Sequence, residues 1–152
     1  MEINKSLIEK LQGLLYSLTH TKEELEMVAD EVEECNLKTA INGLSMESSQ
    51  YANELCMQLK TLGIHYNDSE PSLEVLDGAN SMPLEELNDG LGNELSYICR
   101  RNENFIVNAY RNILNENLLF PGLRDIMQYQ LNALRCAFMK IKLLNSARFT
   151  GY

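Results

Sequence analysis

Residues 127–144, MQYQLNALRCAFMKIKLL, are the stretch that decides the fold. Apolar side chains recur in it every three or four residues, and this spacing places them on one face of a helix. Gln130 is the exception on that face, because it brings an amide among apolar neighbours. The full face consists of Met127, Gln130, Leu134, Ala137, Ile141 and Leu144. The pattern predicts a long helix whose buried face has a polar group near its middle.

Three earlier stretches show the same spacing, each with one polar residue about halfway along its apolar face. The four expected helices cover residues 4–34, 37–62, 93–115 and 123–147. The polar positions are Thr21, Ser48, Asn102 or its neighbour Glu103, and Gln130. Helices of this kind pack by burying their apolar faces against one another. The expected fold is therefore all-α, an antiparallel four-helix bundle with a polar layer across its core.

The segments that join these helices differ in length. Cys35 and Asn36 mark a tight turn, which makes the first two helices antiparallel neighbours. Residues of about 63–92 are instead rich in glycine, proline, asparagine and aspartate, which predicts a long crossover between the second and third helices. Gly63 is expected to end the second helix in a left-handed conformation. Beyond Ala147, we expect a frayed tail.

Length, composition and charge limit the classes of protein to which the chain can belong. Residues 1–152 contain 45% hydrophobic side chains, which suits a single domain with a substantial core. The formal net charge of -9 repels phosphate groups, so we expect no nucleic-acid partner and no membrane partner. No stretch approaches the roughly 20 apolar residues of a bilayer-spanning helix, and we expect no leader segment. These features predict a cytoplasmic protein.

The cysteines also favour that compartment. They are Cys35, Cys56, Cys99 and Cys136. They lie far apart in the sequence and form no Cys-x-x-Cys pair, so a zinc knuckle and a thioredoxin-type motif are not expected. We interpret all four as reduced thiols.

Glu103 is the acidic residue that the spacing places inside the bundle. It follows Cys99 by four residues and precedes Ile106 by three, so it shares the apolar face of the third helix. A buried carboxylate needs hydrogen-bond donors or a cation to offset its lost hydration. The available donors are Tyr51, Tyr110 and Gln130. The expected polar core layer contains Thr21, Ser48, Gln50, Tyr51, Glu103 and Gln130.

A bundle with this crossover is the ferritin-like arrangement, in which inward glutamates and Glu-x-x-His pairs hold metal ions. At the corresponding height the second helix reads Glu47-Ser48-Ser49-Gln50 and the fourth reads Met127-Gln128-Tyr129-Gln130. Glutamine and methionine therefore stand where a di-metal site needs imidazole and carboxylate. We expect no bound cofactor. The remaining candidate metal ligands are Glu23, Glu47 and Glu103.

The chain also resembles a known family over nearly its whole length. The residues that carry the likeness are Leu37-Lys38-Thr39, Tyr51-Ala52-Asn53-Glu54-Leu55, Leu62-Gly63, Asn102-Glu103-Asn104, Ala109-Tyr110 and Gln130. They are similar to a bacterial ferritin-like four-helix-bundle family whose domain is catalogued only as being of unknown function. The chain departs from that family at Phe138, where histidine is common, at Pro83, and in having no tryptophan. The resemblance implies a ferritin-like fold and no established activity.

Two functions of different classes fit these observations. The favoured one is a non-enzymatic helical bundle that acts in assembly or interaction, with a second copy or another protein as partner. The sequence favours it because it shows no nucleophile–base pair, phosphate-binding loop or complete metal-ligand set. The alternative is a ferritin-like metal or small-ligand site of degenerate type around Glu103. Its neighbours would be Glu47, Gln50, Tyr51 and Gln130.

Overall fold

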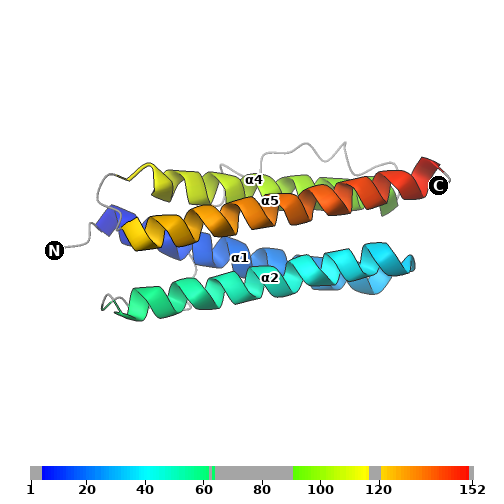
Figure 1. Ribbon diagram of the computed structural model, residues 1–152. Coiled ribbons are helices and arrows are strands. Elements are labelled where there is room, and N and C mark those ends of the chain that lie inside the picture. The colour runs from blue at the N-terminus through cyan, green and yellow to red at the C-terminus, as the bar shows by residue number, and fades with distance from the viewer. Residues whose placement is uncertain (1–4, 62, 64–90, 117–120, 151–152) are drawn as a thin grey trace.

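Four helices make up the described part of the computed structural model, which covers residues 5–61, 63, 91–116 and 121–150. They are α1 (Lys5–Glu31), α2 (Cys35–Thr61), α4 (Leu91–Leu114) and α5 (Pro121–Thr150) (Figure 1). Within these ranges the structure has no β-strand. The predicted all-α four-helix bundle is confirmed. None of the described helices is long and apolar enough to cross a membrane.

The four helices pack side by side with neighbouring helices running in opposite directions (Figure 1). Helix α1 packs on α2 and α4, and α5 packs on the same two helices. Helices α1 and α5 therefore occupy opposite corners of the bundle. The end of α2 and the start of α4 lie at opposite ends of the bundle, so a long connection must join them. That connection is the predicted crossover, and residues 64–90 of it lie outside the described part of the chain.

The turn between α1 and α2 depends on Glu34. Its carboxylate accepts hydrogen bonds from the backbone amides of Asn36 (3.1 Å) and Leu37 (2.6 Å). These amides belong to the first turn of α2, where backbone donors lack partners within the helix. The expected first helix, residues 4–34, is therefore too long at its end. Helix α1 stops at Glu31, because Glu34 serves as the N-cap of α2.

Glycine and proline mark the other described helix ends. Gly63 has a φ of 82° and donates its amide to the Lys60 carbonyl (3.0 Å), which confirms the predicted left-handed cap. Pro121 begins α5, where its missing amide costs no helical hydrogen bond. The expected frayed tail after Ala147 is wrong as far as Thr150, where α5 ends, and residues 151–152 lie outside the described part of the chain. Residues 123–150 contain no glycine or proline, so the backbone can stay helical.

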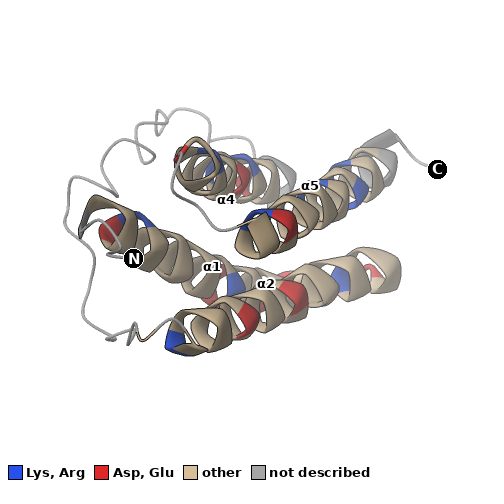
Figure 2. Cartoon of the chain, turned by 60° about the vertical axis from the view of Figure 1, so that its left-hand side comes forward, with Lys and Arg blue, Asp and Glu red and all other residues tan. Residues whose placement is uncertain are grey.

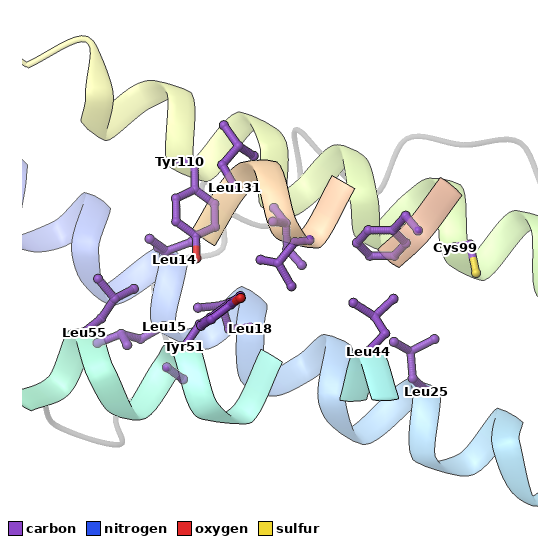
Figure 3. Close-up of a cluster of buried hydrophobic side chains, with 14 of the residues drawn as sticks. Leu14, Leu15, Leu18, Leu25, Leu44, Tyr51, Leu55, Cys99, Tyr110 and Leu131 are labelled. Carbon is purple, nitrogen blue, oxygen red and sulfur yellow. The ribbon is translucent and has the colours of Figure 1, made fainter. Parts of the chain in front are cut away.

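The core is formed by the apolar faces that the spacing predicted (Figure 3). Leu14 on α1, Leu44 on α2 and Leu134 on α5 are all 1% exposed or less. Tyr110 and Phe138 are the largest side chains that are fully buried. Burial of these side chains supplies the main free energy that holds the bundle together.

Candidate functional site

The polar residues predicted at the middle of the helices are inside the bundle, but they form two groups instead of one layer. Thr21, Ser48, Asn102 and Gln130 are each 0% exposed. Thr21 and Asn102 belong to a group between α1 and α4, which we call the α1–α4 cluster. Gln130 belongs to a group shared by α2, α4 and α5, which we call the α2–α5 cluster. Ser48 joins neither, since its hydroxyl donates to the Leu44 carbonyl of its own helix (2.9 Å).

The α1–α4 cluster is centred on Asn102. The Thr21 hydroxyl donates to its side-chain oxygen (2.9 Å). Its side-chain nitrogen donates to the Ile98 carbonyl (2.8 Å) and to the Glu24 carboxylate (3.2 Å). Because every polar atom of this amide has a partner, burying it costs little. The cluster thus fixes how α1 and α4 are aligned along the bundle.

Glu24 is the charged member of the α1–α4 cluster. Its carboxylate pairs with the guanidinium of Arg101 and lies 2.9 Å from the His20 imidazole. Burial alone raises the pKa of Glu24, but the His20 hydrogen bond, the Arg101 charge and the Asn102 amide outweigh it and leave the pKa below its usual value. Glu24 was not predicted from the sequence as a member of the polar core. Its position three residues after Thr21, on the same side of the helix, could have indicated it.

The lowered pKa of Glu24 predicts a specific acid sensitivity. A carboxylate with a folded-state pKa below the unfolded value stabilises the fold above the unfolded pKa, and that stabilisation is lost as pH falls through the folded pKa. We expect the free energy of unfolding to drop more steeply below about pH 4.5 in the unmodified protein than in Glu24→Gln. Urea unfolding at a series of pH values measures both curves. Parallel acid limbs in the two proteins would contradict the prediction.

The α2–α5 cluster links three helices through two tyrosines, one amide and two carboxylates. The Tyr110 hydroxyl of α4 donates to the Gln130 side-chain oxygen of α5 (2.8 Å). Gln130 in turn donates to the Glu54 carboxylate of α2 (3.1 Å). On the same face of α2, the Tyr51 hydroxyl donates to the Glu47 carboxylate (2.7 Å). Figure 3 shows that both tyrosines lie among the buried leucines.

The tyrosines of this cluster are poor acids. Burial is the largest cause of a raised pKa at both Tyr51 and Tyr110, and the nearby carboxylates of Glu47 and Glu54 raise it further. Both hydroxyls therefore stay protonated and act as hydrogen-bond donors at neutral pH. The arrangement is suited to holding three helices together. In their protonated form the two phenols serve neither as a base nor as a nucleophile.

The nucleophilic side chains near the two clusters are likewise held in unreactive forms. Burial raises the pKa of the Cys99 thiol to about 12, so it carries almost no thiolate at neutral pH. The buried hydroxyls of Ser17, Ser45 and Ser48 all donate to backbone carbonyls. Their hydroxyl protons are thus taken up by backbone carbonyls. Ser17 and Ser48 each bond to a carbonyl of their own helix, and Ser45 bonds to a carbonyl of the neighbouring helix.

Glu103 is not the inward residue of α4, so the expectation that it completes the core layer is wrong. Neighbouring residues of a helix point about 100° apart, and Asn102 takes the inward position. Glu103 lies at the edge between α4 and α5, where its carboxylate accepts a hydrogen bond from the Lys142 ammonium (2.6 Å). The physical reason is that a neutral amide is much less costly to bury than a carboxylate. Gln50, also expected in the layer, is exposed and bonds to Glu54.

The three candidate metal ligands lie in different environments. Glu23 is exposed on α1, Glu47 is bound by the Tyr51 hydroxyl, and Glu103 is paired with Lys142. In the described part of the chain, no three histidine, cysteine, aspartate or glutamate side chains are grouped so that they could hold a metal ion. The partly buried carboxylates of the two clusters and that of Glu103 instead meet ammonium, guanidinium, amide or phenol groups.

The fold and these two clusters define a class of protein, an all-α four-helix bundle with buried polar groups that align its helices. Comparisons of the chain with protein-family models, with curated proteins and with solved structures find no match. They therefore identify no family. The resemblance to the bacterial ferritin-like family stays a prediction.

Proposed function

We propose that this chain is a non-enzymatic helical-bundle protein that acts in assembly or interaction with other protein chains. The observation that carries this proposal is a set of large apolar side chains on the outside of the bundle. They are Met27, Met46, Met57, Tyr129, Met139 and Leu143, each more than half exposed. Covering such side chains with a partner removes apolar surface from water, which favours association.

The positions of these side chains on the helices are stronger support for binding than the number of them. Met46 and Met57 lie three helical turns apart on the outward face of α2 and are 73% and 67% exposed. Between Lys38 and Lys60 that helix has only two charged residues, Glu47 and Glu54. Both are engaged by the α2–α5 cluster. Flexible methionines on a weakly charged helix face are typical of surfaces that bind other helices.

We further propose that the bundle is ferritin-like in its chain path. The support is the packing order, in which α1 contacts α2 and α4, α5 contacts the same pair, and a long connection joins the second helix to the third. We place the protein in the cytoplasm. The four cysteines all lie in the described helices and no disulfide joins them, which suits a reducing compartment.

The alternative, a metal or small-ligand site of degenerate type around Glu103, has less support. Lys142 already brings a positive charge to within 2.6 Å of this carboxylate. Tyr51 and Gln130, its expected neighbours, bond to Glu47 and to Tyr110 and Glu54 instead. A cation would have to displace Lys142 and would find few oxygen ligands in return.

Site-specific photo-crosslinking tests the proposed function in cells that make the protein. A photoreactive amino acid would replace Met46, Met57 or Met139 in turn, with the exposed Asn108 of α4 as the matched control position. We expect covalent adducts with another protein chain from the methionine positions and none from Asn108. Adducts at no methionine position would refute the proposal. The adduct mass shows whether the partner is a second copy.

A further inference from the structure

Helix α5 combines exposed apolar and basic side chains on its outward face, in a protein that is otherwise acidic. Met139 and Leu143, 53% and 65% exposed, lie one turn apart. Arg135 and Lys140, both exposed, flank them at helical spacings of three and four residues. The sequence of α5 has no aspartate or glutamate after Asp125. We call Arg135, Met139, Lys140 and Leu143 the basic patch; blue bands along α5 show the basic character of the helix (Figure 2).

Helix α1 has an outward face of the opposite charge. Met27 is 72% exposed. Glu23 precedes it by four residues, while Asp30 and Glu31 follow it by three and four, so all three acidic side chains border the methionine. All three are exposed. We call Glu23, Met27, Asp30 and Glu31 the acidic patch.

We propose that the basic patch of one copy binds the acidic patch of a second copy. This inference rests on the proposed function and names its partner. Each patch places apolar side chains among charges of one sign, and the two signs are opposite, so the patches complement each other. Neither patch complements itself, because two copies of the same patch would bring like charges together. The occupant of the basic patch is therefore the α1 surface of another copy.

The place of the two patches in the fold determines the kind of assembly. Helices α1 and α5 occupy opposite corners of the bundle. A copy that binds through its α1 to the α5 of another copy therefore keeps its own α5 open to a third copy. Such a head-to-tail contact does not close at two subunits and produces rings or open chains. Exposed ion pairs are screened by salt, so the assembly should weaken as ionic strength rises. Burial of Met27, Met139 and Leu143 in the contact supplies an attraction between the copies that salt does not screen.

Charge reversal on either patch tests the contact. One variant is Arg135→Glu with Lys140→Glu, and the other is Asp30→Lys with Glu31→Lys. A matched control, Lys60→Glu with Arg111→Glu, makes the same change in net charge as the first variant at exposed sites outside both patches. Light scattering at rising protein concentration measures the mass in solution, and circular dichroism verifies that each variant is helical. Should a reversed variant fail to fold, the neutral change at the same patch replaces it, Arg135→Gln with Lys140→Gln on α5 or Asp30→Asn with Glu31→Gln on α1.

We expect the unmodified protein and the control variant to form species larger than a dimer at low salt. Each patch variant alone should lose this increase in mass. An equal mixture of the two patch variants should regain it, since the reversed α5 of one now matches the reversed α1 of the other. Association that survives Asp30→Lys with Glu31→Lys would overturn the contact, as would an unmodified protein that stays monomeric. Photo-crosslinks to a different protein in that case would leave the proposed function standing and refute only the second copy as partner.

Discussion

Replacing Leu134 with alanine should lower the free energy of unfolding by about 2 to 5 kcal/mol. Leu134 lies on α5 and is 0% exposed, with α2 and α4 packed against its helix. The substitution removes buried carbon atoms and leaves a cavity that rigid neighbouring helices cannot fill completely. Urea unfolding followed by circular dichroism measures the loss, with the slope of the unfolding line verifying that the transition stays cooperative.

Leu143→Ala is the matched control, because it makes the same chemical change on the same helix at a side chain that is 65% exposed. Measured in dilute protein, where copies do not associate, it should change the free energy of unfolding by no more than about 0.5 kcal/mol. Equal losses for Leu134→Ala and Leu143→Ala would mean that the buried face of α5 has been wrongly placed.

The helices and their core faces were predictable because apolar residues that recur every three or four positions lie on one face of an α-helix. Leu14, Leu44 and Leu134 could be assigned to the core from spacing alone, and each is buried. The helix ends were less predictable, since they depend on single side chains. The Glu34 carboxylate decides where α2 begins, and no periodic pattern contains that information.

The polar positions show where spacing reaches its limit. Asn102 and Glu103 both fit the apolar repeat of α4 to within one residue, and spacing alone could not decide between them. The structure decides for Asn102 through partners on another helix, Thr21 and Glu24, while Lys142 of α5 holds Glu103 at the edge. Such contacts join residues far apart in the sequence. They become visible only once the helices are placed side by side.

The same limit explains why one expected polar layer is two clusters. Each helix does bury a polar residue, as the pattern predicted, but Gln130 lies in the first half of α5 and not at its middle. The register between helices was unknown, however, and it brings Gln130 level with Tyr110 and Glu54 instead of with Thr21. Stability measurements can test how strongly a cluster holds its helices together.

Replacing Gln130 with leucine should lower the free energy of unfolding by about 1 to 3 kcal/mol, although leucine is the more apolar residue. The amide is 0% exposed, and its oxygen accepts a hydrogen bond from the hydroxyl of Tyr110, whose side chain is also fully buried. In the variant this hydroxyl keeps its desolvation cost and loses its acceptor, and the Glu54 carboxylate loses a donor. Urea unfolding of the purified variant gives the size of the loss.

Adding Tyr110→Phe to Gln130→Leu should recover part of that stability, because it removes the hydroxyl that the first change leaves without a partner. Replacing both members of a buried hydrogen bond with apolar groups is often nearly neutral, whereas replacing one is not. The two single variants and the double variant form a cycle that isolates the coupling between the residues. Gln128→Leu, at an exposed position on the same helix, is the control and should have little effect. Additive losses in the cycle would show that the hydrogen bond between Tyr110 and Gln130 does not couple α4 to α5.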